Sequence, residues 1–268
     1  MPDSIYTRDG AAWVPTSAAT GPWGTALHGG APAALLAHAL EAGADGRFPL
    51  ARLTLDLFRP VPSAPLEVSV RTLRAGRRLL VQEAMLAASD TELVRATSVH
   101  GDEQALPADV VPPACPLPAR EGLDEHSLAG AVAERTGRAL PGEDGLHHRL
   151  RVRHSAWFHG AGRGEGWLHL PLELAPGVPL SPTVHLAAVS DFANGVGQLR
   201  LDTAEGRVGF INADISLHVL RPPAGTWIGM LARNDASARG RGLVSAECYE
   251  PDGLVARVTQ TALVMPAG

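Results

Sequence analysis

The sequence contains no lysine. All 23 of its basic residues are arginine, and the 28 acidic residues outnumber them, which leaves a net charge of −5. No basic block is present to collect phosphate contacts, so we expect no nucleic acid partner. Cysteine is scarce as well, with only Cys115 and Cys248. Two cysteines do not suggest a disulfide framework, and their scarcity favours reduced thiols and a cytoplasmic location.

Long apolar runs and several catalytic motifs are also missing. No run of about 18 apolar residues predicts a membrane span, and residues 1–10 lack the pattern of a signal peptide. The Gly-x-Ser-x-Gly elbow of serine hydrolases, the Walker phosphate loop and the Cys/His spacing of zinc sites do not occur. His147 and His148 are adjacent but have no ligand pattern around them. We therefore expect no metal and no separate cofactor.

The chain does contain a repeated pattern. Two stretches alternate apolar and polar residues and end in Arg-Pro, namely RLTLDLFRPVP at 52–62 and ADISLHVLRPP at 213–223. After each comes another apolar stretch, a turn rich in Gly and Arg, and a further strand-like run. Such alternation is typical of half-buried strands in an antiparallel sheet.

Each half is predicted to form one apolar helix followed by an antiparallel meander. Pro32 suits a first helical position and Gly43 a helix end, while Ser181 and Pro182 suit the start of the second helix. In the first half the helix is predicted at 30–43, with strands near 51–59, 64–74, 78–88 and 92–100. In the second half the helix is predicted at 181–199, with strands near 210–220, 226–235, 241–250 and 254–264.

The repeat predicts an α+β fold made by tandem duplication. Residues 105–120 contain five prolines, which is typical of an extended connection. We therefore divide the chain into an N-terminal domain (1–104), a Pro-rich linker (105–145) and a C-terminal domain (146–268). A meander has open edges that are best paired, so the two units are expected to join into one sheet with both helices on its concave side. The alternative is that two unrelated α+β domains share this order of elements by coincidence.

Four segments of the chain resemble the double-hotdog acyl-CoA thioesterases of type II, and most closely their actinobacterial thioesterase-like branch. These segments are LHGGAPAALLAHAL (27–40), SDFANGVG (190–197), FINADISLHVLRPPAGTWIG (210–229) and LVARVTQTALV (254–264). The resemblance covers most of the chain outside the linker. It implies a double hotdog, in which each antiparallel sheet wraps a central helix. Hotdog enoyl hydratases carry a His five residues after their Asp. The residue five after Asp191 is Val196, so this hydratase signature is absent from the sequence.

Two polar residues lie in apolar surroundings. Asp191 is part of an apolar helical stretch, where a carboxylate is either buried and functional or exposed at the surface. Gln260 lies in a strand of Val, Ala and Leu, where it either faces solvent or uses its amide to hold a water molecule. The resemblance implies that Asp191 activates the attacking water and that Gln260 helps to orient it.

Three further polar residues are predicted close to that carboxylate. Asn212 stands where the resemblance leads us to expect Ser or Thr, so it either orients the water through its amide or marks altered chemistry. Asp214 is predicted on the same strand face as Asn212, and pairing with an arginine is its simpler role. Asn194 follows Asp191 by three residues on the predicted helix, which would make the two side chains neighbours.

The sequence His28-Gly29-Gly30 precedes the first helix. Backbone N–H groups at a helix N-terminus attract negative charge, and glycine allows a substrate to approach closely. These glycines are either a tight loop or an oxyanion hole, and the resemblance implies the oxyanion hole. His28 either assists it or caps the helix.

Together these residues predict a split active site at the junction of the two domains. The predicted reaction is hydrolysis of a fatty-acyl or related acyl thioester by Asp-activated water. CoA would enter only as part of the substrate, although an acyl-carrier thioester is equally compatible. A non-hydrolytic acyl-thioester-binding protein, or a biosynthetic hotdog protein with altered chemistry, is the alternative. The resemblance also implies a homo-oligomer.

Overall fold

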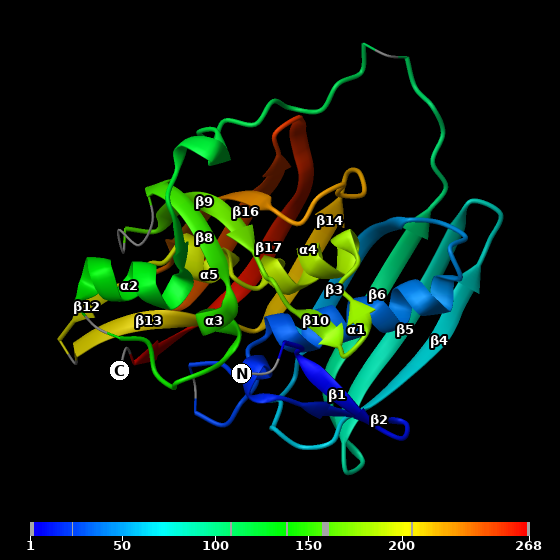
Figure 1. Cartoon of the computed structure of the whole chain (residues 1–268), viewed down its shortest axis with the longest axis horizontal. Coiled ribbons are helices and arrows are strands. Elements are labelled where there is room, and N and C mark those ends of the chain that lie inside the picture. The colour runs from blue at the N-terminus through cyan, green and yellow to red at the C-terminus, as the bar shows by residue number, and fades with distance from the viewer. Residues whose placement is uncertain are drawn as a thin grey trace.

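The computed structural model describes residues 3–22, 24–107, 109–137, 139–156, 161–204 and 206–266. Thirteen strands of the described chain form one sheet that runs through both halves, and its strand pairs are antiparallel. Figure 1 shows the sheet with helices α1 and α4 side by side near its middle. The predicted α+β class and the tandem arrangement are therefore confirmed.

The first half contains the predicted helix and its four-stranded meander. Helix α1 (Gly30–Ala44) is followed by β3 (Leu50–Leu57), β4 (Glu67–Ala75), β5 (Leu79–Ala88) and β6 (Thr91–Gly101). The N-terminal segment adds a separate hairpin of β1 (Tyr6–Asp9) and β2 (Ala12–Pro15) and a short 3₁₀ helix, η1 (Ser17–Ala19). Helix α1 is rich in alanine and is buried over most of its length, so its backbone packs closely on its neighbours.

The second half repeats this order with two interruptions. The predicted helix at 181–199 is wrong in its extent, because it is divided into α4 (Pro182–Ser190) and α5 (Ala193–Val196). The predicted strand at 210–220 is likewise divided at Ala213 into β13 (Gly206–Asn212) and β14 (Asp214–Val219). The remaining strands follow the prediction closely and are β15 (Ile228–Ala236), β16 (Arg241–Glu250) and β17 (Gly253–Pro266).

The strand break at Ala213 has a local cause. Asp214 turns its carboxylate back onto the neighbouring strand, where Oδ1 accepts the Thr261 N–H at 2.6 Å. Ala213 spans the break by accepting the Leu57 N–H and donating its own N–H to the Thr261 carbonyl. The backbone groups at the break are therefore satisfied, although the regular ladder is interrupted.

The two halves join through β3 and β14. These strands pair antiparallel, with Leu55 opposite Ile215 and Leu53 opposite Leu217. All four side chains are fully buried. Each such side chain contributes roughly 1.5–3 kcal/mol by leaving water, so the junction is part of the core rather than a hinge.

The segment between the two halves leaves the sheet and then returns to it. The segment that follows β6 runs outside the sheet in Figure 1, with Val110 and Val111 exposed. It touches the second half where the Pro118 carbonyl accepts the Trp167 Nε1–H at 2.9 Å. The elements that follow are η2 (Arg120–Gly122), β7 (Glu125–Ser127), α2 (Leu128–Thr136) and α3 (Leu146–Arg149). The domain boundaries at 104 and 146 stay a prediction.

The remaining strands complete the far end of the sheet. Strands β7, β8 (Arg151–Ala156) and β9 (Arg163–His169) extend it beyond β15, and β12 (Leu201–Thr203) pairs with β13. Strands β10 (Glu173–Ala175) and β11 (Val178–Pro179) form a separate hairpin.

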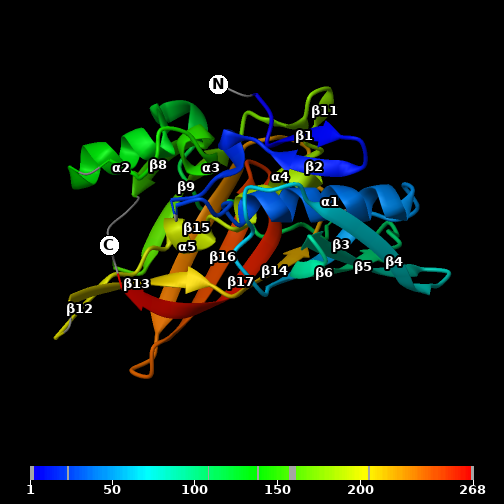
Figure 2. The same ribbon diagram turned by 90° about the horizontal axis from the view of Figure 1, so that it is seen from below.

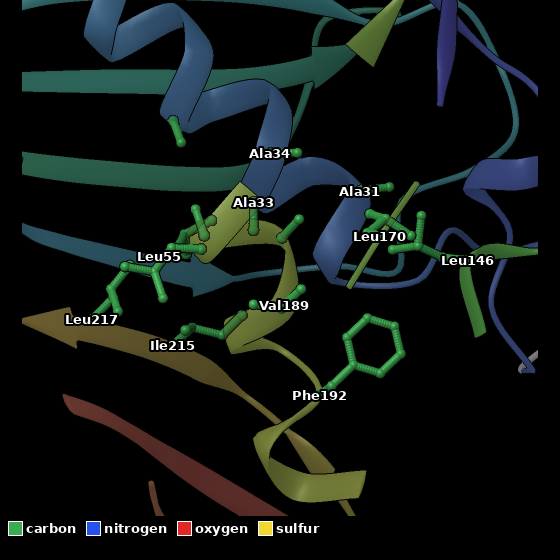
Figure 3. Close-up of a cluster of buried hydrophobic side chains, with 14 of the residues drawn as sticks. Ala31, Ala33, Ala34, Leu55, Leu146, Leu170, Val189, Phe192, Ile215 and Leu217 are labelled. Carbon is green, nitrogen blue, oxygen red and sulfur yellow. The ribbon is translucent and has the colours of Figure 1, made fainter. Parts of the chain in front are cut away.

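The helices lie together on one side of the sheet. Figure 2 shows α1, α4 and α5 on the same side, with β14 and β17 beneath them. In the close-up of Figure 3, Ala33 of α1 and Val189 of α4 lie over Leu55 and Ile215 of the sheet. Helices α1 and α4 run in opposite directions. Gly30 at the start of α1 lies against the Ala188 carbonyl near the end of α4, and Ser181 at the start of α4 contacts Glu41 near the end of α1. This packing brings one end of each helix to a common place.

Candidate active site at the junction of the two halves

Asp191 lies immediately after α4 and is the C-cap of that helix. Its N–H donates to the Val189 carbonyl, and the chain turns here before α5 begins. The carboxylate is nearly buried, with 8% of the side chain exposed. Of the two alternatives for Asp191, this burial excludes the one in which the carboxylate is exposed at a helix surface. The helix end places this carboxylate against the first half of the protein.

The start of α1 receives the Asp191 carboxylate. Nδ1 of His28 lies 2.8 Å from Oδ2 of Asp191, and the Gly30 N–H, which lies 3.2 Å from the same Nδ1, also favours the ionised carboxylate. A Cβ atom on Gly29 would lie only 2.7 Å from Oδ1 of Asp191. Gly29 is therefore required for this close approach, since any side chain would displace the carboxylate.

Asn212 completes the ring of donors around the carboxylate. It ends β13, and its Nδ2 donates to Oδ1 of Asp191 at 3.0 Å. Its own Oδ1 is buried and has no partner among the described residues. An amide that contacts a carboxylate and keeps one free acceptor is suited to hold a water molecule beside that carboxylate.

Gln260 reaches the same place from β17. The side chain is 1% exposed, which excludes the alternative in which Gln260 faces solvent. Its Nε2 donates to the Ser190 carbonyl at 3.0 Å and lies 3.5 Å from the Asp191 carbonyl, which satisfies the end of α4. Its Oε1 is a second buried acceptor without a partner in the described chain. Gln260 contacts the backbone of Asp191 and not its carboxylate.

Opposing effects set the charge of Asp191. Burial alone would raise the pKa of its carboxyl group. The electrostatic effect of His28 and the hydrogen bonds from His28 and Asn212, together with the nearby Gly30 amide, outweigh burial and hold the pKa of Asp191 below its usual value. The site therefore keeps a negative charge within a set of fixed donors.

Asn194 and Asp214 form their hydrogen bonds with partners outside this cluster. Because the chain turns at Asp191, Asn194 no longer follows it on one helix. Asn194 instead donates to the Phe210 carbonyl at 2.9 Å and accepts from Asn234 at 2.8 Å. Both groups of the Asn194 amide are therefore occupied by these partners, and its place beside the carboxylate stays a prediction. Asp214 supports the strand break described above rather than pairing with an arginine.

The glycine pair divides its two N–H groups between different tasks. The Gly30 N–H is directed into the Asp191–His28 pair and is not free. The Gly29 N–H has no hydrogen-bond acceptor within the described part of the chain. Only Gly29 therefore offers a free donor of the kind that an oxyanion hole needs.

The His28–Asp191 pair was not predicted from the sequence. The ring of His28 also stacks on Phe192 at a centroid distance of 4.2 Å and lies 6.4 Å from the ring of His147. The His28-Gly29-Gly30 motif pointed to the helix start, but no sequence signal connected His28 to a carboxylate in the other half. That contact arises from the antiparallel packing of α1 and α4.

The opposite ends of α1 and α4 meet without forming an equivalent site. There the Ser181 hydroxyl donates to Oε2 of Glu41 at 2.7 Å, and the Ser181 Oγ accepts the Val184 N–H at 3.1 Å. No glycine pair precedes α4, and its side-chain cap already satisfies a donor that α1 leaves uncapped. The duplicated fold therefore places the His28–Asp191 pair at one of its two helix junctions only.

Within the described ranges, no group of three or more His, Cys, Asp or Glu side chains is placed to hold a metal ion. In the same part of the chain, no helix has the length and apolar character needed to cross a bilayer.

Comparison with protein families matches both halves of the chain. A family model described as the acyl-CoA thioesterase N-terminal domain matches residues 18–101. A second model, described as the acyl-CoA thioesterase C-terminal domain, matches residues 108–264. No match was found among curated proteins.

Solved structures with the same fold cover nearly the whole chain. A protein of unknown function with hot dog fold from Alicyclobacillus acidocaldarius is 16% identical, with a TM-score of 0.71 over 99% of this chain and 98% of that one. The tesB protein of Mycobacterium avium subspecies paratuberculosis is 18% identical, with a TM-score of 0.67 over 97% and 96%. The acyl-CoA thioesterase II TesB2 of Mycobacterium marinum is 17% identical, with a TM-score of 0.65 over 99% and 96%. These likenesses confirm the hotdog fold.

Proposed function

Because this chain belongs to the acyl-CoA thioesterase family and is a thioester hydrolase, we propose that it hydrolyses a fatty-acyl or related acyl-CoA at the junction of its two halves. The observation that carries this proposal is the Asp191 carboxylate, which leaves the end of α4 and enters a ring of donors from the start of α1 and from β13. Each half supplies a part that the other lacks.

The chemistry requires one group to activate water and another to hold developing negative charge. Asp191 drives the activation of the water, and the amides of Asn212 and Gln260 orient it through their two unpartnered acceptors. Water attacks the thioester carbonyl carbon, the carbon–sulfur bond breaks, and the products are a carboxylic acid and a thiol. The free Gly29 N–H is the donor for the carbonyl oxygen, and loss of one such donor typically costs about 2.7–4 kcal/mol.

The replacement of Ser or Thr by Asn212 is compatible with this proposal. Its Nδ2 supplies the hydrogen bond to Asp191 that a hydroxyl would supply, and its Oδ1 remains available for water. In a protein that only binds acyl thioesters, the ring of donors around Asp191 would have no catalytic role.

The proposal is tested with the purified protein and a panel of acyl-CoA substrates of increasing chain length, with thiol release as the readout. The matched control is Asp191→Asn, which keeps the size of the side chain and an acceptor oxygen but removes the charge. We expect thiol release by the wild-type protein and a loss of at least about 100-fold in the variant. Tight acyl-CoA binding without thiol release by the wild-type protein would instead favour the non-hydrolytic alternative.

A further inference from the structure

The chain contains only three asparagines, and all three take part in one set of contacts that leads to Asp191. Asn212 of β13 donates from Nδ2 to Oδ1 of Asp191 at 3.0 Å. Asn194 of α5 donates from Nδ2 to the Phe210 carbonyl at 2.9 Å. Asn234 of β15 donates from Nδ2 to Oδ1 of Asn194 at 2.8 Å. The hydrolysis described above uses only the first of these asparagines.

Asn194 links the two chain segments that carry the carboxylate and its amide donor. It follows Asp191 by three residues in the chain. Phe210 precedes Asn212 by two residues in β13. The hydrogen bond from Asn194 to Phe210 and the hydrogen bond to the carboxylate therefore close one ring across the two segments. Two such cross-links fix the separation of the segments more firmly than one.

The end of β13 has strand pairing on one side only in the described chain. Strand β17 pairs with β13 up to Asn212, whereas β12 pairs with it only as far as Val208. Two residues beyond Val208, the Phe210 carbonyl accepts its hydrogen bond from the Asn194 side chain. This hydrogen bond therefore holds the part of the strand that presents Asn212 to the carboxylate.

Asn234 determines which way the Asn194 amide points. Because the Phe210 carbonyl can only accept, the NH₂ group of Asn194 must be directed toward it. The oxygen of Asn194 then faces the NH₂ group of Asn234, which satisfies both neighbours. Asn234 is 3% exposed, and its backbone N–H donates to the Gly162 carbonyl at 2.8 Å. A buried and anchored donor therefore keeps the Asn194 amide from turning.

Helix α5, which carries Asn194, is itself packed closely on the sheet. The Val196 carbonyl lies against Gly164 of β9, where no room is left for a side chain. A Cβ atom on Gly197 would lie 3.2 Å from Ala232 of β15. The amide that reaches β13 therefore comes from a fixed support.

We propose that Asn194 is a positioning residue for the hydrolysis, and that it acts by holding Asn212 against Asp191. This inference rests on the proposed function and deepens it, because it adds a residue that would not touch the substrate. Both polar groups of the Asn194 amide are occupied by Phe210 and Asn234. Its effect on the reaction must therefore pass through Asn212.

The kinetic test is a double-variant cycle between Asn194 and Asn212. Asn194→Ala removes the link and leaves Asn212 in place, so kcat for thiol release should fall about 10–100-fold, with KM changed by less than about threefold. In the Asn212→Ala background the same substitution should lower kcat by less than about threefold, because the contact that it serves is already gone. Gly195→Ala is the matched control, since it is the next residue in α5 and has open space at its Cβ position.

A second measurement does not depend on activity. Because the chain has three asparagines, a protein labelled with a stable nitrogen isotope in its asparagine side chains gives three NH₂ signals in NMR, which the alanine variants assign. In Asn194→Ala the Asn212 signal should change its chemical shift and exchange its hydrogens with water faster, because its hydrogen bond to Asp191 is held less firmly. In Gly195→Ala it should stay at its wild-type position.

The outcomes distinguish this inference from the proposed function. If Asn194→Ala melts at a lower temperature but keeps kcat within about twofold of the wild-type value, Asn194 only supports the fold and the inference is overturned. An equal loss of kcat in both backgrounds would also overturn it, because Asn194 would then act independently of Asn212. Either result leaves hydrolysis at this junction standing.

An inactive wild-type protein would give a different result. If it releases no thiol from any acyl-CoA, the proposed function fails, and the NMR measurement still decides whether Asn194 holds Asn212 in place. An Asn212 signal that is the same in Asn194→Ala and in the wild-type protein would overturn the inference in either case.

Discussion

Alanine at Gly29 is expected to damage the reaction more than the fold. The backbone of Gly29 has φ −58° and ψ −24°, which alanine adopts without strain. The new Cβ would lie 2.7 and 2.8 Å from the two carboxylate oxygens of Asp191, whereas ordinary contact begins near 3.4 Å. The carboxylate must therefore retreat by about 0.7 Å, out of reach of some of its donors. A misplacement of this size can cost on the order of 100-fold in rate.

Alanine at Gly30 is expected to damage the fold more than the reaction. Its Cβ would lie 2.5 Å from the Ala188 carbonyl oxygen and 2.9 Å from a methyl group of Leu146. The first contact is backbone against Cβ between two packed helices, so no side-chain rotation relieves it. Overpacking of this kind costs about 1–3 kcal/mol, or roughly 2–12 °C in melting temperature for a chain of this size.

Gly195 supplies the matched control for both variants. It lies in α5 with open space where its Cβ would be, so Gly195→Ala should leave activity and melting temperature unchanged or slightly improved. Thermal unfolding and acyl-CoA thiol release would be measured on the three variants side by side. The reasoning is refuted if Gly29→Ala keeps more than half of the wild-type activity, or if Gly30→Ala melts at the same temperature as Gly195→Ala.

Three more predictions concern polar groups of the core. Asn212→Ser should keep thiol release within about tenfold of the wild-type rate, because a hydroxyl can donate to Asp191. Asn212→Leu should lose about 100-fold or more, and equal rates for the two variants would contradict this prediction. Gln260→Leu should lower the free energy of unfolding by about 1–3 kcal/mol, because the Ser190 carbonyl loses its donor, and urea denaturation would measure it. Burial lowers the pKa of His185 to about 3, so the unfolded state binds an extra proton below about pH 6.5 and stability falls as the pH falls from there toward 3. Between pH 7 and pH 5 the contribution of this group falls by about 2 kcal/mol. His185→Gln keeps an acceptor for the Leu170 N–H but does not titrate. In urea denaturation its free energy of unfolding should therefore decrease less between pH 7 and pH 5 than that of the wild-type protein. An equal decrease in the two proteins would exclude His185 as the cause.

Asp191 and Gln260 were singled out from the sequence because each is a polar residue inside an apolar pattern. That signal survives in the structure, since both side chains are buried in the core. The helix was predicted to continue through Asp191, but it ends at Ser190, and nothing in the local pattern marks the turn there. A helix end of this kind depends on distant partners, here the Gln260 amide that takes up the last carbonyls of α4.

The sequence by itself determined the duplication, the order of helix and strands in each half, and the polar residues that the core would have to accommodate. These features are periodic and local, so each can be deduced from a short window of residues. Only the tertiary structure decided that His28 and Asp191 form a pair, that the Gly30 N–H is directed at that pair, and that the Gly29 N–H has no acceptor among the described residues. The physical reason is the antiparallel packing of α1 on α4, which brings the start of one helix within 3 Å of a carboxylate at the end of the other. No pattern along the chain encodes a distance between residues so far apart in sequence.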